Sequence, residues 1–248
     1  MVRVESYESA LKRRRMVASA GNGETHWRSD YMGQRGRANS EPESFLIEMT
    51  PNEVLLPHFH AVDQFQVFVD GAGVLGRQPI RSLTVHYADH HTGYGPIVAG
   101  SFGLSYFTFR PKTDPGAMYL NMPGYLDALK PSRKRHGTVE NLVLSTKPVL
   151  ASREELVVER LLQEIDADDG LRASLFRLGP EMKVAGSEPS KTGGQYYLIA
   201  NGNLHLNSQD IPEWAIVFVS QIDMALELHA GSEGAEVLVL EFPLRINE

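Results

Sequence analysis

Residues 64–75, QFQVFVDGAGVL, match residues 195–206, QYYLIANGNLHL, when the chain is compared with itself at a shift of 131 positions. Within this stretch Asp70-Gly71 aligns with Asn201-Gly202, and both pairs favour a turn because Asp, Asn and Gly tolerate positive φ. Further identical residues follow at the same shift: Phe45 with Phe176, and Ala99-Gly100-Ser101 with Ala230-Gly231-Ser232. One offset held over about 60 residues predicts two copies of a single β unit.

Short apolar and β-branched runs recur along both copies, with Gly, Pro, Asn or Asp between them. This pattern is typical of an all-β sandwich or barrel. The clearest helix signal is Ser152-Arg-Glu-Glu155, a capping-box pattern, followed by apolar residues at helical spacing as far as Ile165. We therefore expect four regions: an N-terminal arm (1–43), a first barrel (44–111), a linker with short helices (112–170) and a second barrel (171–248).

The composition of the 248-residue chain excludes several kinds of site and partner. No cysteine is present, so disulfides, thiolate nucleophiles and Cys-ligated metals are excluded, and any metal must be held by nitrogen and oxygen. A formal net charge of -7 argues against a nucleic-acid partner. No apolar run approaches the roughly 18 residues of a membrane-spanning helix, and no export signal is evident. We expect a cytoplasmic protein with no membrane partner.

The sharpest local feature is the pair His58-x-His60. On an extended segment both imidazoles lie on one face, about 6–7 Å apart along the strand, and can converge on one ion. Neutral imidazole is a good ligand for Fe, Mn, Ni or Zn. The alternative is a pair of histidines at a strand end that make ordinary hydrogen bonds.

The stretch from Pro57 to Gly71 places Gln64 four residues after His60 and Gly71 six residues beyond Gln64. It resembles the first signature of the cupin superfamily, His-x-His, three or four residues, Glu, six residues, Gly. Through the repeat, the resemblance implies two tandem jelly-roll barrels. It also implies a divalent metal held by His58, His60 and Gln64, although Gln64 stands where the family has Glu. Because Gln195 occupies the matching place in a copy without the histidines, Gln64 could instead serve hydrogen bonding within the barrel.

The second cupin signature is not matched, so the sequence leaves a further ligand open. The candidates for an additional ligand or a substrate contact are His86, His90, His91 and Tyr94. In the second copy the positions of His58 and His60 hold Pro189 and Lys191, and His205 and His229 stand alone in the sequence. The second barrel is therefore expected to lack a metal site.

Two functions compete at this stage. The first is a metal-dependent enzyme, dioxygenase-like or an isomerase, that acts on a small organic substrate, anionic and chelating because a neutral ligand set leaves the full charge on the metal. The second is a non-catalytic bicupin that binds a small molecule or serves a structural role. A homodimer is expected in either case, since the arm and the linker have no other evident role.

Overall fold

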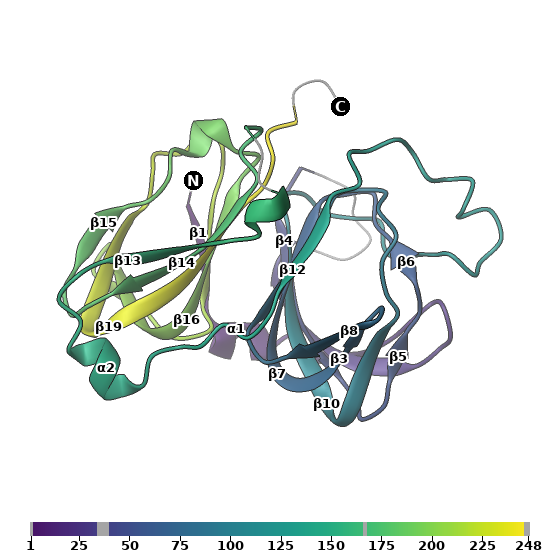
Figure 1. Cartoon of the computed structure of the whole chain (residues 1–248), viewed down its shortest axis with the longest axis horizontal. Helices are drawn as coiled ribbons and strands as arrows, with labels where there is room; N and C mark the ends of the chain where they lie inside the picture. The colour runs from purple at the N-terminus through teal and green to yellow at the C-terminus, as the bar shows by residue number, and fades with distance from the viewer. Residues whose placement is uncertain (1, 34–39, 166–167, 246–248) are drawn as a thin grey trace. The chain divides into compact units, whose positions relative to one another are not determined.

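The computed structural model describes residues 2–33, 40–165 and 168–245 and divides into two compact units. The first unit is Ala10–Leu142, and the second combines Met1–Ser9 with Val143–Glu248. Parts of three predicted regions lie outside the described residues: 1 and 34–39 of the arm, 166–167 of the linker and 246–248 of the second barrel. Each unit is a curled antiparallel sheet (Figure 1).

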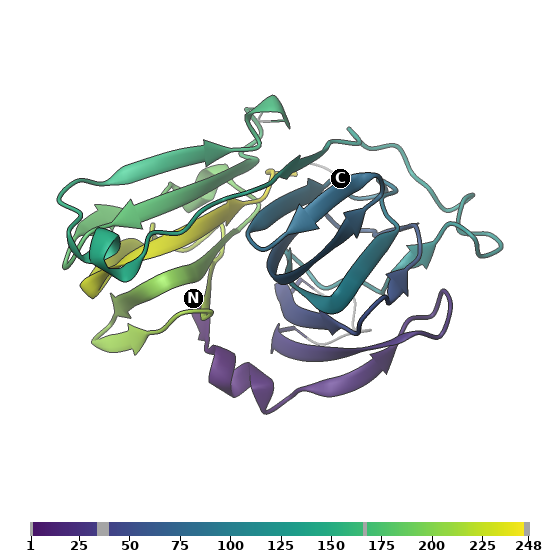
Figure 2. The ribbon, with the colours of Figure 1, turned by 60° about the horizontal axis from the view of Figure 1, so that its bottom comes forward.

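The first unit holds a nine-stranded sheet in the order β12-β9-β7-β10-β4-β3-β2, with β5 paired to β10 and β8 to β7. A two-stranded pair, β11-β6, lies beside it, and Figure 2 shows the blue and teal strands curving into an open barrel. The elements are β2 (Arg15–Ala18), β3 (Thr25–Met32), β4 (Glu43–Met49), β5 (Val54–Leu55), β6 (His58–Phe59), β7 (Gln64–Leu75), β8 (Gln78–Arg81), β9 (Thr84–Ala88), β10 (Ile97–Arg110), β11 (Met118–Tyr119) and β12 (His136–Val139).

The second unit holds an eight-stranded sheet in the order β1-β18-β16-β19-β14-β13, with β15 paired to β19 and β17 to β16. Helix α1 (Tyr7–Leu11) spans the boundary between the units. The other elements are β1 (Arg3–Glu5), α2 (Lys147–Ala151), β13 (Val157–Leu161), η1 (Gln163–Ile165), β14 (Arg172–Leu178), β15 (Lys183–Ala185), η2 (Pro189–Lys191), β16 (Gln195–Leu206), β17 (Gln209–Ile211), β18 (Ile216–Val219) and β19 (Glu227–Glu241).

The predicted duplication is confirmed strand by strand. Strand β16 begins and ends 131 residues after β7, and β19 follows β10 at nearly the same shift. The turn predicted at Asp70-Gly71 and Asn201-Gly202 is wrong, because Gly71 lies inside β7 and Gly202 inside β16, each beside a shift in the pairing register that marks a β-bulge. The two glycines behave alike: Gly71 has φ +76° and Gly202 has φ +70°. A Cβ atom at either position would meet the carbonyl oxygen of the facing glycine, at 2.3 Å and 2.1 Å respectively. Glycine is therefore required at both bulges for its conformation and for the close approach of the backbone.

Two features of the predicted organisation differ in the structure. Residues of the predicted arm form β2 and β3, which extend the first sheet beyond β4, so this segment belongs to the first unit. The helix predicted over 152–165 is wrong, because Val157–Leu161 is the strand β13, paired with β14. Two adjacent β-branched valines favour the extended state, and their backbone finds partners on β14. None of the helices in the described ranges is long and apolar enough to cross a membrane.

Candidate functional site

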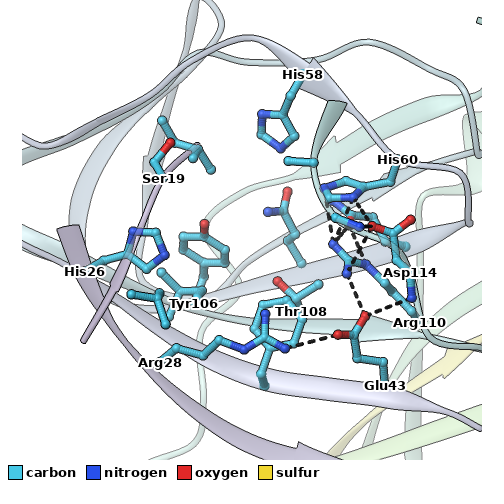
Figure 3. A pocket seen from close by; sticks show the side chains of 18 of the residues that line it. Ser19, His26, Arg28, Glu43, His58, His60, Tyr106, Thr108, Arg110 and Asp114 are labelled. Carbon is cyan, nitrogen blue, oxygen red and sulfur yellow. Dashed lines mark hydrogen bonds and ion pairs between the residues drawn. The ribbon is translucent and has the colours of Figure 1, made fainter. Parts of the chain in front are cut away.

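A small cavity of about 80 Å³ opens in the first unit, inside its curved sheet (Figure 3). Strand alternation supplies its walls, because every second residue of a strand points to the same face. In this way β7 contributes Gln64 and Gln66, and β10 contributes Tyr106, Thr108 and Arg110. The remaining polar residues of the wall are Ser19, His26, Arg28, Glu43, His58, His60, Tyr94, Asp114 and Tyr119. The structure thus gathers four of the predicted site residues here: His58, His60, Gln64 and Tyr94.

Four side chains of the wall form a directed chain of hydrogen bonds. His58 donates from Nδ1 to the carbonyl oxygen of Leu56 (2.7 Å), so its Nε2 accepts the hydroxyl proton of Tyr94 (3.0 Å). The Gln64 amide donates to the same Tyr94 oxygen. Gln64 Oε1 in turn accepts from Nε and Nη2 of Arg110, at 3.1 Å and 3.0 Å. The chain thus links Arg110 to His58 through Gln64 and Tyr94, and both lone pairs of the Gln64 oxygen are used.

The carboxylate of Asp114 fixes the orientation of the His60 ring. His60 Nδ1 donates to Asp114 Oδ2 at 2.7 Å, and Asp114 is itself anchored by the backbone amides of Ala61 and Gly116. Arg110 Nη2 lies 3.2 Å from Nδ1 and 3.1 Å from Nε2 of His60. Near-equal distances to both ring nitrogens place the guanidinium against the ring face, so the in-plane lone pair of Nε2 still points elsewhere.

The charged residues of the wall form a closed network of ion pairs. Arg110 contacts Glu43 at 2.7 Å and Asp114 at 3.6 Å, and Glu43 also contacts Arg28 at 3.1 Å. Arg28 continues to Asp30 at 2.6 Å. Among the residues that line the cavity, the two arginines and two carboxylates cancel in formal charge, and each has an oppositely charged partner (Figure 3).

Burial sets the protonation of the site. It lowers the pKa of His58 to about 3, helped by the neighbouring His60, and it also lowers the pKa of His60, with Arg110 adding to the effect. Burial would raise the pKa of Asp114, but its interactions with His60 and with the Arg110 guanidinium outweigh it and hold that pKa well below its usual range. Burial raises the pKa of Tyr94 above its ordinary value. At neutral pH the site therefore holds neutral imidazoles, a neutral phenol and an ionised Asp114.

The other predicted candidates do not line the cavity. His86 bonds Thr138 through Nδ1 at 3.0 Å, and His90 bonds Asp63 at 2.8 Å. His91 follows the end of β9 in a left-handed conformation (φ 54°), and its ring lies 5.6 Å from that of Phe59. In the second unit, the expectation that His205 and His229 stand alone is wrong. They face each other across β16 and β19 with ring centroids 5.1 Å apart.

Sequence reasoning missed the charged half of this site. Asp114 reads as part of an Asp-Pro-Gly turn, and Glu43 was assigned to the arm. Arg110 did carry a signal, since it ends a long apolar strand and aligns with Glu241 at the end of the matching strand. A charge in the same place of two apolar strands indicates a buried ion pair or hydrogen bond.

Comparison with known proteins supports the fold. No known family profile matches the sequence, and no curated protein matches it. Solved structures do: a proposed dioxygenase from Nostoc punctiforme aligns over 100% of this chain and 85% of its own, with a TM-score of 0.65 and 12% identity. Salicylate 1,2-dioxygenase from Pseudaminobacter salicylatoxidans aligns over 97% and 84% (TM-score 0.59, 12% identity). These likenesses show the fold, an all-β arrangement of two antiparallel barrels shared with these structures.

A third solved structure, the bacterial pirin YhhW from Escherichia coli in complex with nickel(II), aligns over 99% of this chain and 100% of its own, with a TM-score of 0.54 and 10% identity. Identities this low concern the fold alone, so the donor atoms of this chain decide whether a metal fits. His58 Nε2 accepts from Tyr94, Gln64 Oε1 accepts twice from Arg110, and only His60 Nε2 of the three keeps an in-plane lone pair. No three His, Asp or Glu side chains converge on one point among the described residues. As arranged, this site does not fit a divalent metal.

Proposed function

We propose that the first cupin unit binds a small organic molecule in this cavity without a bound metal ion. The observation that supports the proposal is the chain from Arg110 through Gln64 and Tyr94 to His58, which uses the lone pairs that a metal would need. The guanidinium lies against His60, where a second cation would meet its charge. A ligand in the cavity would contact the uncharged side chains of Tyr94 and His58, which form part of the polar wall.

Metal analysis tests this proposal. The purified protein is incubated with Fe(II), Mn(II), Ni(II) or Zn(II) at micromolar concentrations, desalted and analysed for metal by mass spectrometry. We expect no metal that depends on His58 and His60, so the His58→Ala, His60→Ala double variant should match the wild type. One equivalent of metal per chain, lost in that variant, would contradict the proposal. A His205→Ala, His229→Ala variant is the control, since it removes the neighbouring imidazoles of the second unit.

A second candidate is the metal-dependent, dioxygenase-like enzyme expected from the sequence. One observation favours it: His58 and His60 both donate from Nδ1 to an oxygen, Leu56 O and Asp114 Oδ2. Histidines that ligate metals usually make this bond, which turns Nε2 toward the ion. For this candidate Tyr94 must leave His58. The Tyr94→Phe variant then binds metal more tightly than the wild type, whereas the metal-free proposal expects no binding in either.

The remaining sequence-based expectations, a homodimer and a cytoplasmic location, stay predictions. Size-exclusion chromatography with light scattering tests the first. The chain mass is 27.6 kDa, so a species of twice that mass is the expected result.

A further inference from the structure

Three polar side chains of the cavity take no part in the hydrogen-bond chain or the ion-pair network. Gln66, Tyr106 and Thr108 are 2%, 3% and 2% exposed. Gln66 Oε1 is fully buried without a hydrogen-bond partner, and the hydroxyls of Tyr106 and Thr108 line the cavity without a protein hydrogen bond among the described residues. Gln66 on β7 pairs directly with Thr108 on β10. Tyr106 lies two residues before Thr108 on β10, so both side chains are on the same face of the strand. The hydroxyls of Tyr106 and Thr108 point toward the middle of the cavity (Figure 3).

These groups are costly for the folded protein. A buried polar group without a partner loses its bonds to water and gains none in return, so an apolar residue of the same shape is normally more stable there. The second unit shows that replacement. At the shift of 131 residues, Tyr106 and Thr108 correspond to Val237 and Val239, both buried in an apolar core. The first unit retains an unused amide and two unused hydroxyls where its duplicate has valines and Tyr197.

The charges of the wall, by contrast, are already matched. Arg28, Glu43, Arg110 and Asp114 are paired with one another or with Asp30 and His60. A charged ligand would have to leave water without a free counter-charge, which is strongly unfavourable in a buried site. The polar groups of the cavity that remain available to a ligand, those of Gln66, Tyr106 and Thr108, are uncharged.

Resting on the proposed function, we infer that the ligand is a small uncharged molecule with at least one N–H or O–H group, held by Gln66, Tyr106 and Thr108. Gln66 Oε1 can only accept a hydrogen bond, so the ligand must supply a donor. The two hydroxyls and the amide nitrogen can then serve a carbonyl or hydroxyl oxygen. Hydroxy-amides and small polyols have this chemistry, and hydroxy-acids differ from them by a charge.

Matched pairs of probes test the ligand class. Glycolamide and lactamide are compared with glycolate and lactate, which have the same number of non-hydrogen atoms, by saturation-transfer NMR titration of the full chain. We expect the amides to bind at least about tenfold more tightly than the acids, because only the acids carry an uncompensated charge into the cavity. The variants Gln66→Leu, Tyr106→Phe and Thr108→Val should each weaken amide binding by about fivefold or more.

Melting temperatures separate a ligand contact from a structural one. Without ligand, Tyr106→Phe and Thr108→Val should not lower Tm, since neither hydroxyl bonds another side chain among the described residues and both face the cavity. The control is Tyr197→Phe in the second unit. It removes a hydroxyl that donates to Gln195 Oε1 at 2.9 Å, and it should lower Tm.

The outcomes are distinct. Acids that bind as tightly as the amides would overturn the inferred ligand class and leave small-molecule binding intact. Variants that lower Tm as Tyr197→Phe does, or that bind the amides unchanged, would show that these three residues do not hold the ligand. If no probe of either class binds up to about 50 mM, where a ligand of this size should occupy a suited pocket, the proposed function fails as well.

Discussion

Each unit has a glutamine at the same position of its barrel, and the charged side chain next to that glutamine has opposite sign in the two units. In the first unit Arg110 donates to the Gln64 oxygen, and in the second the Gln195 amide donates to Glu241, which aligns with Arg110. Tyr197 then donates to the Gln195 oxygen. A primary amide carries both donors and an acceptor, so it satisfies either neighbour by turning over. The shared glutamine is a hydrogen-bonding hub of each barrel.

The interiors around the two hubs diverge. The second unit fills its barrel with apolar side chains, including Val217, Val237 and Val239. The first unit instead encloses His58, His60 and two ion-paired arginines, together with polar groups that no described residue satisfies. After a duplication, the copy that serves only as structure can improve its packing, whereas the copy that binds a ligand must keep groups that cost stability. This contrast yields predictions that can be measured one unit at a time.

The largest effect is expected at the charged neighbour of each hub. Arg110→Met leaves Glu43 buried without its partner at 2.7 Å, so the first unit should lose about 3–5 kcal/mol of unfolding free energy. Glu241→Gln in the second unit keeps a hydrogen-bonding group and should cost less than about 1.5 kcal/mol. The chain has two tryptophans, Trp27 in the first unit and Trp214 in the second, so denaturant unfolding of Trp27→Phe and Trp214→Phe backgrounds reports each unit separately. Equal losses in both units would contradict the comparison.

Acid should unfold the first unit before the second. Burial lowers the pKa of His58 and of His86 to about 3, below the value of about 6.5 in the unfolded chain. The unfolded state therefore binds protons first, and the contribution of these histidines, complete above pH 6.5, falls as pH decreases toward 3. Each should account for about 2 kcal/mol between pH 7 and pH 5. In the second unit burial raises the pKa of Glu241, so its contribution is lost as pH rises and has the opposite sign.

Urea unfolding at pH 5, 6 and 7 measures this difference. His86→Val copies the residue that the second unit has at this position, Val217, and should reduce the loss of stability of the first unit between pH 7 and pH 5 by about 2 kcal/mol. His205→Val, in the second unit, is the matched control and should leave that slope unchanged. A first unit whose stability stays constant from pH 7 to pH 5 would disprove the assignment of buried neutral histidines.

The bulge glycines Gly71 and Gly202 should respond alike, because the duplication preserves them for the same reason. Gly71→Ala and Gly202→Ala each place a Cβ against a carbonyl oxygen at a positive φ, so each should destabilise its own unit by about 2–3 kcal/mol. The single-tryptophan backgrounds again separate the two. A large effect in one unit with none in the other would mean that the two copies have diverged at this bulge.

These glycines also explain which parts of the structure were predictable. The repeat, the strands and the inward position of His58 and His60 depend on period-two alternation and turn residues, which are local signals. Arg110, Glu43 and Asp114 come together from β10, β4 and a turn, so only the closed sheet reveals their pairing. The helix expected over 152–165 failed for the same reason, since the backbone partner of Val157–Leu161 lies on a strand that follows later in the chain.

Replacing the shared glutamine by glutamate should change the unfolding free energy by a smaller amount, and the two units should respond differently. Gln64→Glu places a carboxylate beside Arg110 and should change stability by less than about 1 kcal/mol, because the new charge is paired at once. Gln195→Glu places a carboxylate beside Glu241 and should cost about 1–3 kcal/mol through like-charge repulsion in a buried site. If Gln64→Glu also gains Ni(II) binding that His58→Ala removes, the missing carboxylate is what keeps the natural site free of metal.

The smallest effect is expected where the two copies look most alike. Inside β10, at the shift in its pairing register with β7, the sequence reads Ala99-Gly100-Ser101-Phe102-Gly103, and Glu233 stands in the place of Phe102 in β19. Phe102 is 95% exposed, so Phe102→Glu should change the unfolding free energy by less than about 0.5 kcal/mol. Gly103→Ala, one residue on, should cost far more, since its φ is +84° and a Cβ would lie 2.7 Å from the carbonyl oxygen of Met49. If Phe102→Glu were as damaging as Gly103→Ala, the similarity of the two bulged stretches would reflect side-chain contacts, whereas the structure attributes it to the backbone.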